Sequence, residues 1–110
     1  MARLGYLSHS SPTRGREQVK DRFAAEGLGW RYLAENIALE PCWARFWTDG
    51  RVEPYTWAEA ARNAVEHWMQ SAGHRENILS PHARQMGVGA AAAPADGRPY
   101  LYITQNFLAP

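Results

Sequence analysis

The chain has 110 residues, of which 45% are hydrophobic, and it contains five Trp, five Tyr and three Phe. This length and composition suit one modest globular domain and exclude a disordered chain. The formal net charge of +1 predicts no strong field, so neither nucleic acid nor an anionic membrane is an expected partner. Nor does any apolar run reach the roughly 18 residues of a membrane span.

The first third of the chain contains one clear helical pattern. Residues 1–7 are apolar enough to end a helix or form a buried strand, and residues 8–15 are rich in Ser, Pro and Gly, which predicts turns. Residues 17–27 predict a short helix with Val19 and Phe23 on its apolar face and Gly27 as its stop. Residues 28–39 mix aromatic and polar side chains without a period that assigns them to one structure.

An aromatic-rich segment and the clearest helix follow. Residues 41–55 predict an irregular or hairpin-like excursion around the Asp49-Gly50 turn signal. Thr56 and Glu59 have the spacing of a capping box, and Gly73 predicts the end of the helix that they begin. The expected apolar face of this helix consists of Trp57, Ala61, Ala64, Val65, Trp68 and Met69.

A hairpin closes the chain. Residues 86–93 and 98–107 flank an Asp96-Gly97 pair, and the second run alternates in the manner of a strand. Helices first and a hairpin last predict a mixed α/β fold of the α+β kind, in which helices pack on a small sheet.

Three residues are candidates for a site, although each has an ordinary structural explanation. His74 directly follows Gly73, where an imidazole can interact with the last carbonyls of a helix or point into a cleft. Glu35 lies between apolar residues, so it is either a local cap or an inward-facing charge that needs a partner. His9 lies in a turn and can bond to nearby hydroxyls.

The remaining reactive residue types favour packing or solvation. His67 lies two helical turns from His74, about 10 Å away, too far to share one metal ion directly, so we expect it to be solvated. His82 follows a Ser-Pro pair and is expected in a surface turn. The only cysteine, Cys42, lacks a disulfide partner and is expected to pack as a small apolar group. We expect the nearby aromatic residues Trp43, Phe46, Trp47, Tyr55 and Trp57 to belong to a core more than to a ligand pocket.

Taken together, five stretches resemble a known family. GYLSHSSP, AENIA, AVEHWMQSAGHRENILSP, MGVGAAAA and YITQNF follow one another in the order and spacing of the CAP superfamily, which comprises cysteine-rich secretory, antigen 5 and pathogenesis-related 1 proteins. The similarity is greatest to its bacterial, SCP-like extracellular branch. It implies one CAP domain over residues 1–110, folded as an α-β-α sandwich with a small antiparallel sheet and a central cleft.

The resemblance also implies a site. Matched by motif, His9, Glu35 and His74 fall on the family's cleft residues, which in some members bind a divalent metal; His9 and His74 would be the metal ligands, with Zn²⁺ as the expected ion. Ser71 stands where the family has a second glutamate, so one carboxylate is missing, and either Glu59 or Glu66 would have to replace it.

A further departure concerns the start of the chain. Family domains begin about a helix earlier, so the resemblance implies that this chain is N-terminally truncated and lacks the first helix. MARLGYLSH has no apolar signal core, but a signal peptide would lie upstream, so we expect the full-length protein to be extracellular or in the cell envelope. The uncovered sheet would favour a homodimer.

Three functions compete on this evidence. The first is a secreted binding module whose cleft holds a divalent metal or a small apolar ligand such as a lipid, and this is the function that we expect. The second is a metal-dependent hydrolase, for which the missing carboxylate leaves no general base. The third is a structural role in which His9, Glu35 and His74 form a buried polar network. The catalytic residues stay unassigned.

Overall fold

The computed structural model describes residue 1 and residues 4–110. Within these residues the helices and strands follow the order α1 (Val19–Ala25), β1 (Tyr32–Pro41), β2 (Trp43–Phe46), β3 (Val52–Pro54), α2 (Trp57–Met69), α3 (Ala72–Ile78), β4 (Gln85–Ala95) and β5 (Arg98–Ala109). Residues 4–7 belong to none of these elements, although the sequence allowed a helix end or a strand there.

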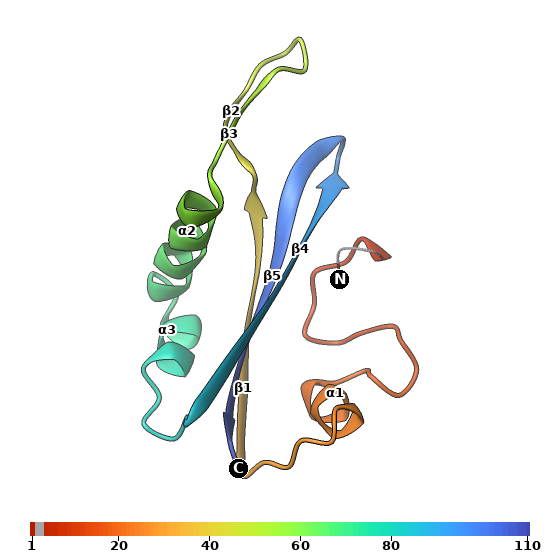
Figure 1. The fold of residues 1–110 in the computed structure, drawn as a ribbon, viewed down its shortest axis with the longest axis vertical. Helices are drawn as coiled ribbons and strands as arrows, with labels where there is room; N and C mark the ends of the chain where they lie inside the picture. Colours follow the sequence, from red (N-terminus) through yellow and green to blue (C-terminus); the bar gives the residue numbers. More distant parts are fainter. Residues whose placement is uncertain (2–3) are drawn as a thin grey trace.

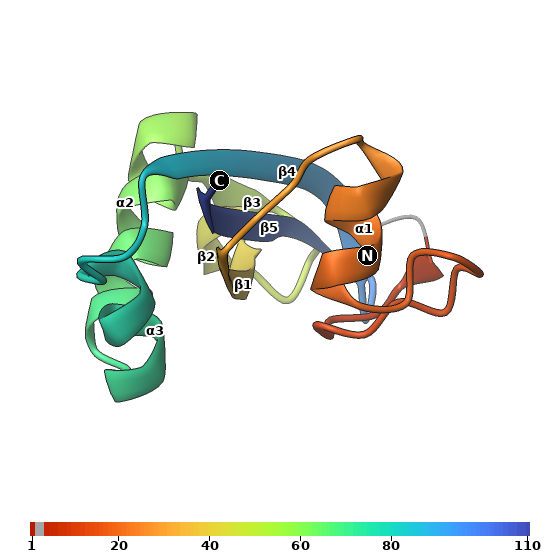
Figure 2. The same cartoon turned by 90° about the horizontal axis from the view of Figure 1, so that it is seen from below.

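The main sheet is antiparallel and has the strand order β1-β5-β4. α1 lies on one side of it and α2 and α3 on the other, as both views show (Figures 1 and 2). The expected α+β fold, with helices on a small antiparallel sheet, is therefore confirmed. β2 and β3 form a separate two-stranded sheet that projects beyond the main one (Figure 1).

β1 is buried on both faces, and this explains why the sequence did not identify it. Successive side chains of a strand point to opposite faces, so a strand covered on one face alternates between apolar and polar residues. β1 instead buries Glu35, Asn36, Ala38 and Glu40, which places polar side chains inside on both sides. The sequence of β1 therefore shows neither the apolar–polar alternation of a strand with one exposed face nor the continuous apolar residues of a fully buried strand.

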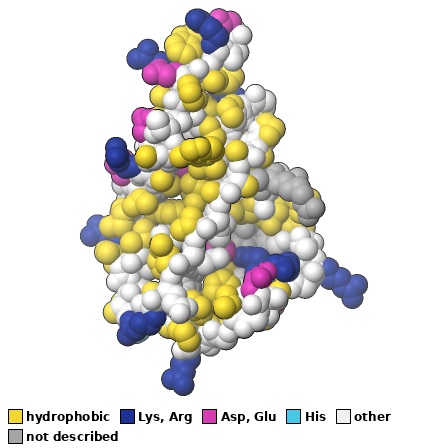
Figure 3. Space-filling model, in the orientation of Figure 1, with side chains coloured by type: hydrophobic (Ala, Val, Ile, Leu, Met, Phe, Trp, Pro, Cys, Tyr) yellow, Lys and Arg dark blue, Asp and Glu magenta, His cyan; other side chains and the backbone are white. Residues whose placement is uncertain are grey.

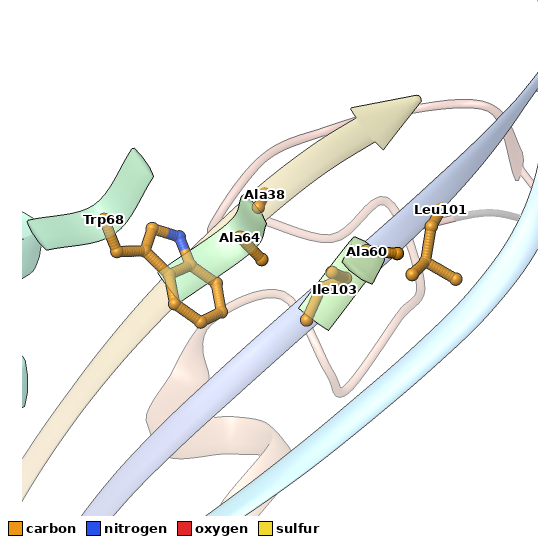
Figure 4. Close-up of a cluster of buried hydrophobic side chains, with 6 residues drawn as sticks. All are labelled: Ala38, Ala60, Ala64, Trp68, Leu101 and Ile103. Carbon is orange, nitrogen blue, oxygen red and sulfur yellow. The ribbon is translucent and has the colours of Figure 1, made fainter. Parts of the chain in front are cut away.

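The packed core lies between α2 and the sheet (Figure 4). The capping box of α2 is confirmed, since the Glu59 N–H donates to Thr56 Oγ1 and the Thr56 N–H donates to Glu59 Oε1. The expected apolar face is only partly correct, because Trp57 is 71% exposed and Val65 is also exposed. The helix turns two alanines and one tryptophan to the sheet. The core consists of Ala38, Ala60, Ala64, Trp68, Leu101 and Ile103.

The prediction that Gly73 ends this helix is wrong. α2 ends at Met69, the backbone becomes extended at Ser71, and Gly73 lies inside the first turn of α3. Gly73 is not among the glycines with positive φ, whereas Gly27, the predicted stop of α1, has φ of 73°. His74 is therefore a helical residue and does not follow a helix stop.

Both predicted hairpins are confirmed. Asp96 and Gly97 have φ of 52° and 73°, the left-handed values that a tight turn between β4 and β5 requires. In the β2–β3 hairpin, Trp43 packs edge-on against Phe46 and Tyr100. Trp47 at its tip is exposed, so not all of these aromatic residues enter a core.

Candidate functional site

A buried polar cluster surrounds Glu35. Its carboxylate is only 3% exposed, and Arg22 Nη2 donates to both of its oxygens at 3.1 and 3.0 Å. His9 Nδ1 lies 2.8 Å from Oε1 of the same carboxylate, while the imidazole remains 54% exposed. Of the two interpretations of Glu35, a local cap or an inward-facing charge, the structure has the second, and the partners of the buried carboxylate are a histidine and an arginine.

Arg22 organises the chain around this carboxylate. It comes from α1, which lies on the Glu35 face of the sheet, and its guanidinium also donates to the carbonyl of His9. Further hydrogen bonds run to the carbonyls of Arg16 and Glu17. One guanidinium therefore neutralises a buried charge and fixes the turn-rich segment that positions His9.

The third predicted residue, His74, lies on the other side of the sheet. Its carbonyl accepts a hydrogen bond from Asn36 Nδ2 at 3.1 Å, and Asn36 points to the face opposite Glu35. α3 and α1 indeed flank the sheet from opposite sides (Figures 1 and 2). The structure thus brings His9 to Glu35 and does not bring His74 to either of them.

The residue that follows Glu35 holds α3 on the sheet. Asn36 is fully buried; it donates to Gln105 Oε1 as well as to His74, and its Oδ1 accepts from Asn77 Nδ2 at 2.9 Å. All three side-chain bonds are satisfied, which makes this network structural. His74 enters the network through its backbone, so the imidazole is free of this role.

A hollow of about 480 Å³ lies beside the Glu35 cluster, between α1 and the strands β4 and β5. Arg22 forms part of its wall, and its lining combines apolar and polar side chains with one glycine: Arg16, Arg22, Phe23, Glu26, Leu28, Gln85, Met86, Gly87, Thr104, Asn106 and Leu108. Figure 3 shows hydrophobic side chains around this region, with a charged pair at its edge.

The hollow contains an acceptor without a donor. Asn106 lies directly opposite Glu35 in the β1–β5 register and lines the hollow. Its Oδ1 is buried and receives no hydrogen bond from residue 1 or residues 4–110. A buried carbonyl oxygen without a partner is costly. Because this oxygen has almost no exposed surface, a donor in the hollow reaches it only if the Asn106 side chain turns.

A second carboxylate–imidazole pair occurs at the far end of β1. Glu40 is buried, and its Oε1 lies 2.7 Å from Nδ1 of His67, whose side chain is 61% exposed. The expectation that His67 is solvated holds for most of the imidazole, but its Nδ1 also pairs with a buried carboxylate. Glu40 had not been recognised as a partner, since the pairing depends on how α2 docks on β1.

Cys42 behaves as the sequence predicted. It packs against the cluster formed by α2 and the sheet, and burial raises the pKa of its thiol. A raised pKa lowers the thiolate fraction at neutral pH, which makes the residue a poor nucleophile. Cys42 therefore belongs to the packing of the domain.

The order of these features along the chain matches one protein family. A comparison with family sequence profiles matches residues 9–107 to the cysteine-rich secretory protein family, CAP. This chain belongs to the CAP family. The match includes the His9 turn, the Glu35 strand, α2, α3 and the final hairpin, which are the stretches on which the resemblance was based.

Individual relatives of this CAP domain are bacterial. It is 33% identical over 84 residues to the uncharacterized protein YkwD of Bacillus subtilis, covering 76% of this chain and 25% of that protein. It is 30% identical over 108 residues to the uncharacterized membrane protein YlbC of the same organism, covering 98% of this chain and 23% of the relative. The chain thus spans about a quarter of each of these curated relatives.

A solved structure supports the same fold. The CAP domain matches an extracellular protein containing an SCP domain from Bacillus anthracis with a TM-score of 0.60 and 26% sequence identity. The alignment covers 98% of this chain and 27% of that protein. No helix in the described part of the present chain is long and apolar enough to cross a membrane.

The metal that the family implies does not fit the side chains as they are arranged here. Both oxygens of Glu35 accept from Arg22, and a cation placed on this carboxylate would have to displace or approach a guanidinium. Among residues 1 and 4–110, no three His, Cys, Asp or Glu side chains form a group that could hold one ion. Glu59, a suggested substitute carboxylate, is engaged in capping α2.

The sequence identified His9 and Glu35 but missed Arg22 and Asn106, which complete the region around this carboxylate. Arg22 could have been found, because it lies next to Phe23 on the inward side of a short helix, where a cation requires a buried anion. Asn106 gave no signal, since an asparagine near the end of a strand is ordinary. Its importance arises only from the hollow that α1 leaves beside it.

Proposed function

We propose that this CAP domain is a non-catalytic binding module whose ligand occupies the hollow between α1 and the β4–β5 strands. One observation carries the proposal, namely that the buried Oδ1 of Asn106 has no hydrogen-bond partner among residue 1 and residues 4–110 and belongs to a residue in the wall of a cavity with apolar and polar side chains. Ligand sites typically combine apolar walls with a few polar groups that fix the orientation of the ligand.

The chemistry of the wall defines the ligand class. Phe23, Leu28 and Leu108 offer contact to an apolar body, and Asn106 Oδ1 requires a hydroxyl or N–H donor. Arg22 is already committed to Glu35, so the ligand needs no negative charge. The proposed ligand is therefore a small, mainly apolar molecule with one hydrogen-bond donor.

A hydrolytic function has less support. The His9–Glu35 contact resembles the pair in which a carboxylate orients a general base. However, Arg22 donates to both carboxylate oxygens, and His9 is not among the residues that line the hollow. We therefore assign His9 to the structure of the turn, with its outer nitrogen facing solvent.

We also propose that the protein containing this domain acts outside the cytoplasm. The solved relative from Bacillus anthracis is described as extracellular, and a CAP domain that spans nearly all of this chain aligns with it. An extracellular site is compatible with the single, packed cysteine, which needs no reducing environment.

Titration with two matched probes tests the binding proposal. 1-Naphthol has an apolar body and a hydroxyl donor, whereas 1-methoxynaphthalene has the same body without a donor. We expect 1-naphthol to shift the backbone NMR signals of residues that line the hollow. Its affinity should fall about tenfold in Asn106→Leu, which is the magnitude of one lost hydrogen bond.

The second probe and a second variant provide the controls. 1-Methoxynaphthalene should bind more weakly than 1-naphthol and should not respond to Asn106→Leu. Asn63→Leu makes the same substitution on α2, remote from the hollow, and should leave both affinities unchanged. Equal binding of the two probes, or no shift at the hollow, would contradict the proposed function.

A further inference from the structure

β4 forms an open edge of the sheet. It has 11 residues, from Gln85 to Ala95, and among residue 1 and residues 4–110 it pairs with β5 alone in the order β1-β5-β4. The pairing with β5 continues residue by residue without a register shift, whereas the β2–β3 pair contains one. β4 therefore presents a long, regular row of backbone donors and acceptors on its outer side (Figure 2).

The sequence of β4 lacks the features that usually protect such an edge. Natural edge strands are short, bulged or interrupted by charged residues and prolines. β4 contains no charged residue between Gln85 and Ala95, and its one proline, Pro94, is next to its end. Met86 and Val88 are each 59% exposed, and hydrophobic side chains gather over the middle of this face (Figure 3).

The charges at the two ends of β4 are arranged symmetrically. Arg84 lies six residues before Ala90, and Asp96 lies six residues after it. If two copies of β4 pair in antiparallel orientation about a twofold axis at Ala90, each Arg84 meets the Asp96 of the other copy. Within the described part of the chain neither residue belongs to an ion pair. Arg84 Nη1 donates to the carbonyls of Pro81 and Ala83, and its other guanidinium nitrogens have no ion-pair partner among these residues, so the contact adds a carboxylate to an arginine that is already oriented.

The same register also suits the side chains. Met86 would lie opposite Pro94 of the second copy, and Val88 would lie opposite Ala92. Each exposed large side chain thus faces a smaller one, and the central pairs consist of alanine and glycine, which let two backbones approach. No like charges oppose each other anywhere along the strand.

We propose that the open edge of β4 binds the same edge of a second copy of this chain, in antiparallel orientation about Ala90. The product is a symmetric dimer with a continuous six-stranded sheet in the order β1-β5-β4-β4-β5-β1. This contact is isologous, so it closes after two copies and leaves no free β4 edge for further growth. Gln85, Met86 and Gly87 of β4 also line the hollow beside α1, but the dimer requires no ligand there.

Sedimentation equilibrium over a range of concentrations tests the proposal. We expect the wild-type chain to dimerise and Ala90→Lys and Ala90→Glu each to be monomeric, because like charges would face each other on the twofold axis. An equimolar mixture of the two variants should recover the dimer, since lysine then faces glutamate. Arg84→Glu should weaken the wild-type dimer about tenfold by placing like charges at both ends.

Two controls keep the test specific. Ala61→Lys introduces the same charge at an exposed position of α2 and should dimerise like the wild type. Circular dichroism should show the same helix and strand content in every variant, and recovery of the dimer on mixing shows that each variant is folded. A wild-type chain that stays monomeric at its solubility limit, or an Ala90→Lys variant that dimerises normally, overturns the proposal and leaves the edge to a strand from another protein.

Discussion

Two buried glutamates on β1 differ in their hydrogen-bond and ion-pair partners, and this difference gives them different roles. Glu35 and Glu40 lie five residues apart on β1, so their side chains enter opposite faces of the sheet. Each carboxylate is buried and lies within 2.8 Å of Nδ1 of an exposed histidine. Among the described residues, only Glu35 also has a guanidinium partner, and that partner, Arg22, lines the hollow.

Arg22 is therefore expected to be the most sensitive polar residue of the domain. Arg22→Met leaves Glu35 buried with His9 as its remaining partner, and the loss of one member of such a pair costs about 3 kcal/mol. The bonds to the carbonyls of His9, Arg16 and Glu17 disappear with it. The midpoint of urea unfolding should fall accordingly.

A second arginine close to the same helix serves as the control. Arg16 pairs with Glu26 on the surface, where both side chains are exposed, so Arg16→Met should cost less than about 1 kcal/mol. Adding Glu35→Gln to Arg22→Met should recover part of the loss, because the stranded charge is then removed. If Arg22→Met is no more harmful than Arg16→Met, the assigned role of this guanidinium is wrong.

At the scale of single elements, local signals predicted local structure. The capping residues of α2 and the turn pairs at Asp49-Gly50 and Asp96-Gly97 are specific in sequence and were interpreted correctly. β1 and α3 escaped prediction because their form depends on distant partners. β1 is extended because β5 pairs along its whole length, and Gly73 is helical because Asn36 and Asn77 hold α3 on the sheet.

The candidate site was also predicted only as far as local motifs allow, because its contacts depend on residues that are distant in the sequence. The motif resemblance selected His9, Glu35 and His74, but the chemistry of a site depends on which side of a sheet each residue reaches. Because side chains alternate along β1, Glu35 and Asn36 point to opposite faces of the sheet. Asn36 binds the carbonyl of His74, so α3 and His74 lie on the face opposite Glu35. Arg22 and Asn106, which complete the Glu35 region, meet it only through the docking of α1 and the register of β5.

The cap of α2 gives a pH-dependent contribution whose sign can be stated. The hydrogen bond from the Thr56 backbone N–H, helped by the Thr56 side chain, lowers the pKa of Glu59. A carboxylate whose pKa is lower in the folded state stabilises the fold above its ordinary pKa, and the stabilisation is lost as pH falls through the lowered value. The N-cap of α2 should therefore weaken in acid.

Two variants isolate this contribution. Glu59→Gln keeps an acceptor oxygen and removes the charge, so it should be less stable than the wild type at neutral pH and equal to it below the pKa of Glu59. Thr56→Ala removes the cap itself and should cost about 1 kcal/mol. Thermal unfolding at several pH values measures both effects, and a difference between Glu59→Gln and wild type that persists in acid would contradict the assignment.

At the scale of the whole molecule, the two faces of the sheet are packed unequally. On one face α2 contributes Ala60, Ala64 and Trp68 to a continuous core, and Trp68 Nε1 donates to the carbonyl of Ile37. On the other face the seven-residue α1 buries only Phe23 and leaves the hollow beside it. A helix of that length has little stability of its own, so its attachment depends on Phe23 and Arg22.

This asymmetry predicts two levels of local stability within one domain. Local opening occurs where few apolar side chains are buried, and amide hydrogen exchange reports its free energy. We expect the amides of α2, β1 and β5 to exchange only through global unfolding and those of α1 to exchange much faster. Phe23→Ala should accelerate amide exchange in α1 alone, whereas Trp68→Ala, which removes a large buried side chain, should accelerate exchange in the whole domain.

A ligand in the hollow contacts both α1 and the sheet, so saturation with 1-naphthol should slow amide exchange in α1 towards the exchange rate of the strands. Uniform exchange of α1 and β5 without ligand would show instead that the two faces are equally stable.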